Sequence, residues 1–101
     1  MSARIIMSVV AAEHGMSMGD MLSRRIASAP TRYTAALLMQ RVLGLAPKQI
    51  AYEFGRSPSF AHHALKAARE RLHGDYLAQG RFNELERLCQ AALALARKEA
   101  A

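Results

Sequence analysis

The sequence predicts an all-α fold: a compact helical domain that contains a helix-turn-helix and carries an additional C-terminal helix. Three observations support this prediction. Ala, Leu, Met and Arg are frequent in the 101 residues, whereas aromatic residues make up only 6%, a composition that favours helices over sheets. Glycines and prolines divide the chain into segments whose apolar residues recur every three or four positions. Hydrophobic residues make up 51% and charged residues 22%, which is typical of a chain that folds as one domain.

Two helices are predicted before residue 24. The first begins near Ser2, ends at Gly15 and carries on its apolar side Ile5, Ile6, Val9, Val10 and Ala12. The second is short and opens at Ser17, whose hydroxyl can cap it, with Asp20 three residues on as in a loose capping box. We expect its buried residues to be Met18, Met21 and Leu22.

A basic loop, residues 24–29, leads into the third predicted helix. Pro30 suits the first turn of that helix, and Gly44 ends it after Leu43. The spacing places on one side of this helix Tyr33, Leu37, Leu38, Arg41 and Val42.

Residues 45–66 predict a helix-turn-helix. Pro47 starts its first helix, and Gly55 suits the left-handed residue after the end of that helix. Ser57 suits the N-cap and Pro58 the first residue of the second helix, which reaches about Leu72. The side chains predicted to pack inward are Ile50, Ala51, Phe54, Phe60, Ala61, Ala64, Leu65 and Ala68. An ordinary helical hairpin in a small bundle has the same pattern, so the spacing alone leaves both interpretations open.

The last predicted helix runs from about Phe82 to Lys98, with a stripe of Leu85, Leu88, Cys89, Ala92, Leu95 and Ala96. We therefore divide the chain into a helix-turn-helix DNA-binding domain, residues 1–74, and a C-terminal helix, residues 75–101. The stripe either packs on the domain or forms the seam of a homodimer. A second copy would supply the two half-sites that small helix-turn-helix proteins often need.

Positive charge is concentrated in the middle of the chain. The formal net charge is +6, and residues 21–69 hold eight basic residues against one acidic residue, Glu53. A local excess of this kind is typical of a protein that binds a polyanion, although a solvated basic surface without a partner gives the same count.

Several classes of function are disfavoured. Cys89 is the only cysteine, so the chain forms no internal disulfide and no cysteine-rich zinc site, and we expect a buried, inert thiol. His62 and His63 point about 100° apart on a helix and cannot chelate one metal ion together. The sequence has no glycine-rich phosphate loop and no nucleophile–base pair. We expect no enzyme activity, no cofactor and no metal, and the sequence makes no small-molecule ligand evident.

We also expect no membrane association. No apolar stretch reaches the roughly 18 residues that a membrane span needs. Glu13 and His14 follow the apolar N-terminal run at once, without a clear signal-peptide cleavage site. The expected location is the bacterial cytoplasm.

The leading end of the second helix of the motif carries polar side chains suited to DNA. A B-DNA major groove, about 12 Å wide, accepts such a helix. The residues predicted to be exposed there are Arg56, Ser57, Ser59, His62, His63 and Lys66. Ser and His can contact base edges or phosphates, the helix N-terminus attracts phosphate, and Lys48 can bind the DNA backbone.

Residues 5–72, about two thirds of the chain, resemble the C-terminal DNA-binding domain (domain IV) of the bacterial replication initiator DnaA. Residues 18–25 (MGDMLSRR) are similar to that family's "xxDLLSxxR" stretch, and residues 45–56 (LAPKQIAYEFGR) to its "SLPEIGxxFGGR". The resemblance implies a Trp-repressor- or DnaA-like fold. It also implies that the basic loop enters the minor groove, with Arg24 and Arg25 as minor-groove or phosphate contacts. Lys48 would contact phosphate, and the second helix of the motif would enter the major groove.

This chain departs from the family at the residues that contact the DNA bases. The family's Asp-His-Thr-Thr falls on residues 57–60 (SPSF), with one glycine deleted at the turn, so the family's recognition sequence is not implied. The ATPase module does not fit in 101 residues, and we expect a stand-alone relative such as a small regulator or a phage-type protein. The candidate DNA-binding residues are Arg24, Arg25, Arg32, Lys48, Arg56, Ser57, Ser59, His62, His63 and Lys66.

The expected function is that of a small transcriptional or replication regulator that binds double-stranded DNA. One alternative is a helical protein-interaction module that has lost base-specific reading; an exposed Phe60 would favour it, and a buried Phe60 would favour DNA. Another is a packaging component similar to a phage terminase small subunit, in which the C-terminal helix assembles a ring.

Overall fold

The computed structural model describes residues 1–100, which form six α-helices and one short 3₁₀ helix and contain no β-strand. The all-α prediction is therefore confirmed. The elements are α1 (Ser2–Glu13), α2 (Met18–Leu22), η1 (Ile26–Ser28), α3 (Ala29–Leu43), α4 (Pro47–Phe54), α5 (Pro58–Leu72) and α6 (Tyr76–Ala100). No helix in this part of the chain combines the length and the apolar character needed to cross a membrane.

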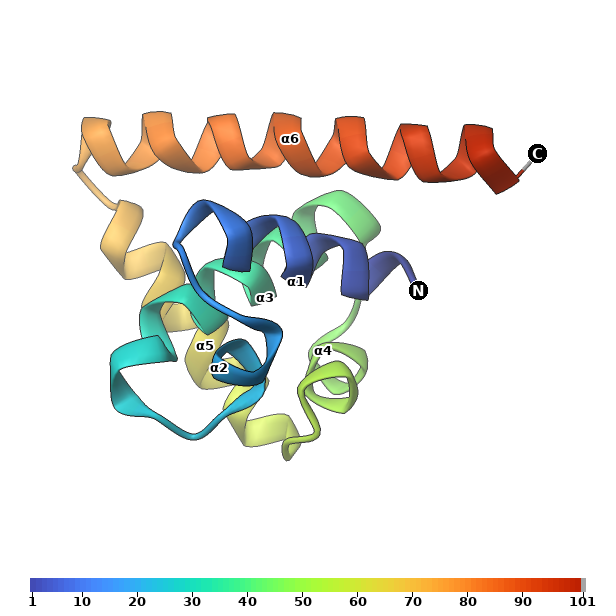
Figure 1. The fold of residues 1–101 in the computed structure, drawn as a ribbon. Helices are drawn as coiled ribbons and strands as arrows, with labels where there is room; N and C mark the ends of the chain where they lie inside the picture. The colour runs from blue at the N-terminus through green and yellow to red at the C-terminus, as the bar shows by residue number, and fades with distance from the viewer. Residues whose placement is uncertain (101) are drawn as a thin grey trace.

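Helix α3 is the central element of the core. It packs against α1 on one side and α5 on another, while α6 crosses above α1 (Figure 1). Five consecutive residues of α3, 35–39, are buried, because neighbouring helices cover it on several sides. The predicted one-sided stripe is therefore wrong for α3: Tyr33 and Val42 are only partly buried, and Arg41 is exposed.

The first two helices follow the prediction with small changes. Ser2 is not the cap of α1, since Met1 occupies the N-cap and Ser2 is already helical. The buried residues of α1 are Ala3, Ile6, Met7, Val10 and Ala11, whereas the predicted Ala12 is exposed. Ser17 does cap α2, because its side-chain oxygen accepts a hydrogen bond from the Asp20 backbone N–H at 3.0 Å.

Helices α4 and α5 form the predicted helix-turn-helix, joined by the three residues 55–57. Gly55 ends α4 in the left-handed region with φ +65°, where a side chain is strained even though no atom lies near its Cβ direction. The inward residues of the motif are confirmed: Ile50, Ala51, Phe54, Ala61, Ala64, Leu65 and Ala68 are buried, and Phe60 is partly buried.

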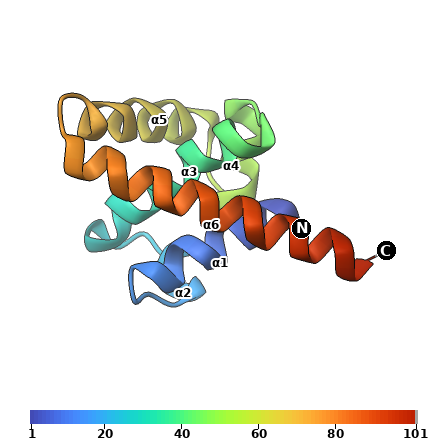
Figure 2. The same ribbon diagram turned by 90° about the horizontal axis from the view of Figure 1, so that it is seen from above.

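Helix α6 is longer than predicted, with 25 residues beginning at Tyr76 rather than near Phe82. The Asp75 carboxylate accepts a hydrogen bond from the Ala78 N–H at 3.0 Å and so caps the earlier start. The buried residues of α6 are Phe82, Leu85, Cys89 and Leu93, and the predicted Leu95 is 58% exposed. Figure 2 shows that α6 lies across the body and that its last turns extend past it. The C-terminal helix thus packs on the domain, and the homodimer seam stays a prediction.

Candidate nucleic-acid interface

An open groove of about 460 Å³ lies at the N-terminal end of α5. Five of the ten predicted DNA-binding residues line it together with Gly55 and Phe60, namely Arg24, Arg56, Ser57, Ser59 and His63. No acidic side chain is among these lining residues. The fold therefore brings the basic loop and the start of the second motif helix to one positively charged concave surface.

Within residues 1–100, one backbone hydrogen-bond donor beside this groove, the Ser59 N–H at the N-terminus of α5, is unbonded. Ser57 occupies the N-cap position, but its hydroxyl bonds the Ser59 hydroxyl at 2.8 Å instead of capping the helix. Pro58 has no backbone N–H, and within residues 1–100 the Ser59 N–H forms no hydrogen bond. Open amides at a helix N-terminus attract anions through both hydrogen bonding and the helix dipole.

Phe60, which lines the groove, belongs to a cluster of aromatic rings that pack on the core. The Phe60 ring lies 5.2 Å from the Phe54 ring and 6.4 Å from the Tyr33 ring, measured between centroids. His63 meets Tyr33 edge-on at 5.4 Å, and the Arg56 guanidinium lies 5.0 Å above Phe60. Phe60 is thus partly buried beneath Arg56, which lies between the two outcomes expected for a DNA-binding and a protein-binding surface.

Two arginines hold the basic loop in place from different elements. Arg56, in the helix-turn-helix turn, donates from Nη2 to the Ser23 carbonyl at 2.8 Å. Arg32, in the first turn of α3, donates from Nη2 to the Arg25 carbonyl at 2.9 Å. The loop and the N-terminus of α5 are therefore positioned relative to each other by side chains, as well as by the chain connecting them.

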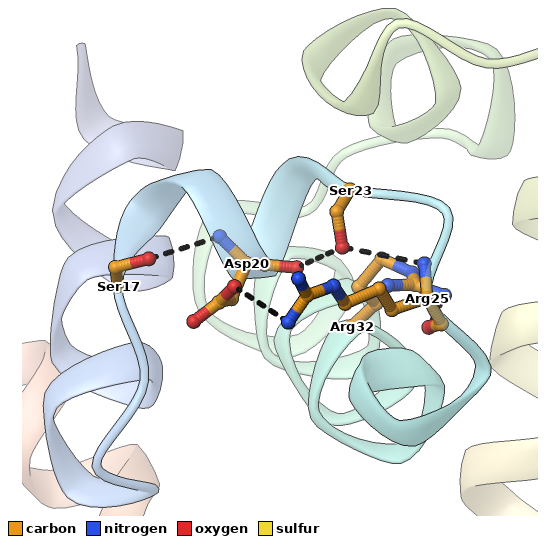
Figure 3. A network of polar contacts seen from close by, with 5 residues as sticks. All are labelled: Ser17, Asp20, Ser23, Arg25 and Arg32. Carbon is orange, nitrogen blue, oxygen red and sulfur yellow. Dashed lines mark hydrogen bonds and ion pairs between the residues drawn. The ribbon is translucent and has the colours of Figure 1, made fainter.

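The loop also has an internal polar network, shown in Figure 3. The Ser23 hydroxyl donates to the Asp20 carbonyl at 2.7 Å and accepts from the Arg25 N–H at 3.3 Å. The Arg25 guanidinium lies 3.7 Å from the Asp20 carboxylate, but its side chain remains largely exposed. This ion pair orients Arg25 without removing it from solvent.

The structure contradicts the expectation that Arg32 contacts DNA directly. Arg32 is only 4% exposed, and its Nε and Nη1 are buried without a hydrogen-bond partner among residues 1–100. Burial, and secondly the nearby Arg56 charge, lower the pKa of Arg32 below its ordinary value. Arg32 therefore acts on the loop from inside, as a positioning residue.

The other predicted contacts lie outside the groove. Lys48 is exposed on α4, and His62 and Lys66 are exposed on α5 but do not line the groove. Another part of the basic excess is used within the fold, because Arg41 forms a salt bridge with Glu86 of α6 at 3.1 Å. The position of Tyr33 in this aromatic cluster was not predicted, since no local pattern links it to Phe54 and Phe60.

Comparisons of the chain with protein-family models, with curated proteins and with solved structures find no match. The resemblance to the DnaA domain consequently stays at the level of the sequence motifs quoted above.

Proposed function

We propose that the protein binds duplex DNA as a small transcriptional or replication regulator, acting in the bacterial cytoplasm. The observation that carries this proposal is the acid-free groove at the N-terminus of α5, lined by Arg24, Arg56 and His63 and adjoining the open Ser59 amide. A phosphate group fits these donors, and a major groove accepts the exposed side of α5 beside them.

The proposed contacts divide into two kinds. Arg24, Arg25 and Lys48 bind backbone phosphates, with the loop lying at the minor groove, and so set the position of the protein on DNA. Ser59 and His62, on the exposed side of the first turns of α5, reach the base edges. Sequence preference thus rests on Ser59 and His62, and affinity rests mainly on the basic side chains.

The primary test is binding of a labelled 20-base-pair duplex, measured by fluorescence anisotropy at several NaCl concentrations. Release of counterions from a handful of phosphates gives a log–log slope of roughly −3 to −6. A matched pair of variants localises the site: Arg24→Gln should weaken binding about tenfold, while Arg97→Gln, at the end of α6, should change it less than about twofold. Absence of binding at 50 mM NaCl would overturn the proposal.

A second experiment distinguishes residues that contact the DNA backbone from residues that contact base edges. Lys48→Ala should weaken binding to all duplexes alike, whereas Ser59→Ala or His62→Ala should change the ranking of sequences selected from a random pool. An unchanged ranking in both of the latter variants would show that α5 does not read bases through these side chains.

Exposed apolar residues in the basic loop and on α4 favour a second candidate function, binding of a protein partner. Ile26, beside Arg25 in the loop, is 89% exposed, and Tyr52, one turn after Lys48 on α4, is 81% exposed. The double variant Ile26→Ser, Tyr52→Ser separates the two functions. Retained DNA binding in this variant supports the DNA function, whereas loss of a protein complex with no DNA binding in either form supports the alternative.

A further inference from the structure

A second cavity, of about 310 Å³, lies at the opposite end of α5 from the basic groove. It is enclosed by the end of α1, the start of α3, the end of α5 and the start of α6. Its apolar lining residues are Pro30, Ala68, Leu72, Ala78, Phe82 and Leu85, and Thr34 adds a polar side chain beside them. Phe82, Leu85 and Ala68 belong to the buried core, so the floor of the cavity is a fixed part of the fold.

The rim of this cavity is basic. Arg71 from α5 and Arg81 from α6 line it together with His14, and the only acidic lining residue is Asp75. One oxygen of Asp75 is engaged, because it accepts the Ala78 N–H that begins α6. Within residues 1–100, neither Arg71 nor Arg81 forms a salt bridge. The cavity thus combines an apolar floor with two guanidinium groups that lack an anionic partner.

Hydrogen bonds hold the rim in a defined shape. The Gln79 side chain donates to the Leu72 carbonyl at 2.7 Å and so fixes the turn between α5 and α6. The His14 Nδ1 lies 2.8 Å from the Val10 carbonyl, which requires Nδ1 to be the donor and leaves Nε2 available.

We propose that this cavity binds a small organic anion in which a carboxylate is joined to an apolar body. The carboxylate bonds Arg71 and Arg81. The apolar body lies against Pro30, Leu72 and Ala78, whose side chains are partly exposed. The volume lies at the lower end of the roughly 300–1,000 Å³ range of small-molecule sites, which suits a compact ligand better than a folded partner. The site lies about 20 Å along the helix axis from the N-terminus of α5, so it is independent of the proposed DNA binding.

The probe for this proposal is 4-phenylbutyrate, titrated into the ¹⁵N-labelled protein and followed by amide chemical shifts. Two related compounds separate the two halves of the site: 4-phenylbutanamide has the same body without charge, and acetate has the charge without the body. We expect saturable shifts at His14, Thr34, Ala68 and Ala78, at least fivefold weaker binding of the amide, and no saturable shift with acetate. Equal binding of the acid and the amide, or shifts scattered over the surface, would overturn the proposal.

Variants on one helix provide the matched control. Arg81→Gln should weaken 4-phenylbutyrate at least fivefold, and Arg97→Gln, on the same helix beyond the cavity, should leave its affinity within about twofold. Both variants should keep the wild-type circular dichroism spectrum and wild-type DNA affinity, so that failure here is distinguishable from failure of DNA binding. Equal affinities of the two variants would contradict the site.

An acidic peptide distinguishes a protein partner from a small ligand at the same place. Tyr76 and Leu77, at the start of α6, are 86% and 76% exposed and would extend an interface beyond the cavity. The probe is the capped peptide Glu-Glu-Phe-Glu-Glu. Tighter binding of this peptide than of 4-phenylbutyrate, with shifts spreading to Tyr76 and Leu77, would overturn the small-ligand proposal in favour of a protein-docking site.

Discussion

Arg32 places a positive charge inside the protein, where its guanidinium forms one hydrogen bond within residues 1–100, to the Arg25 carbonyl. A buried charge without an acidic partner costs free energy, so its removal by an apolar side chain of similar length is nearly neutral for stability. We expect Arg32→Met to change the free energy of unfolding by less than about 1 kcal/mol and to weaken DNA binding about tenfold, because the loop loses its anchor. Thermal unfolding and anisotropy measure the two effects, and a large fall in Tm with unchanged DNA affinity would contradict a positioning role.

Cys89 is a buried thiol whose chemistry is suppressed by its surroundings. Burial, and secondly the charge of Glu86, raise the pKa of Cys89 from 9.0 to about 11. Between these two pH values the unfolded thiol loses its proton while the folded one keeps it, so stability falls as the pH rises. We expect the protein to lose about 2 kcal/mol by pH 11 relative to a Cys89→Ala variant, whose pH dependence lacks this contribution. Urea unfolding from pH 8.5 to 11 measures the difference, and parallel curves for the two proteins would contradict it.

At the scale of the elements, two glycines with open space around them should respond to the same substitution in opposite directions. Gly55 sits at φ +65° in the turn of the helix-turn-helix, whereas Gly80 lies inside α6. Gly55→Ala should destabilise by about 1 kcal/mol, because an L side chain is strained in the left-handed region. Gly80→Ala should stabilise by up to about 1 kcal/mol, because alanine loses less backbone entropy in a helix. Equal signs in urea denaturation would show that the turn does not require the left-handed conformation.

Helix α6 is attached to α3 by a charged contact as well as by its apolar residues. Arg41 donates to both carboxylate oxygens of Glu86, at 3.1 and 3.4 Å, and lies 5.5 Å above the Phe82 ring. Glu86→Gln should destabilise the protein by about 0.5–1 kcal/mol. Glu84 provides the control, since its pair with Arg87 lies within α6 and is exposed, and Glu84→Gln should cost less than about 0.3 kcal/mol. Equal losses would mean that Arg41 and Glu86 do not hold the helices together.

At the scale of the whole molecule, positive charge is concentrated in the middle of the chain and few acidic residues balance it. Residues 21–69 carry eight basic residues and one acidic residue, and two of the basic ones, Arg32 and Arg56, lie close enough to repel each other. Screening by salt weakens this repulsion more in the folded state, where the charges are closer. We expect the Tm to rise by several degrees between 20 and 300 mM NaCl in the absence of ligand. A Tm that falls with salt would indicate that attractive pairs outweigh the repulsion.

The local features of the helix-turn-helix were predictable because each depends on a few neighbouring residues. Pro47, Gly55 and Pro58 act on the backbone at their own positions, so the ends of α4 and α5 follow from the sequence. The inward side of these two helices also follows, since each is covered mainly on one side. The buried sides of the central helix α3 were not predictable from the sequence. A helix that its neighbours cover on several sides has no polar stripe that indicates its orientation.

The candidate site was predictable only in part for a related reason. Residues adjacent in sequence, such as Ser57 and Ser59, were correctly placed at the leading end of α5, and Arg24 in the loop beside it. Arg32 was assigned to the surface because its charge alone cannot indicate burial. Local spacing likewise cannot bring Tyr33 beside Phe60.

The sequence by itself determined the helical class, the breaks between helices and the concentration of positive charge, because these depend on composition and on short-range backbone chemistry. Only the tertiary structure decided which basic side chains face solvent and which are buried or paired within the protein. It alone also decided that a second cavity forms where four helices meet. Arg41 and Glu86 lie 45 residues apart, and Arg56 reaches a carbonyl 33 residues earlier in the chain. Contacts at such separations depend on how whole helices pack, which no window of neighbouring residues contains.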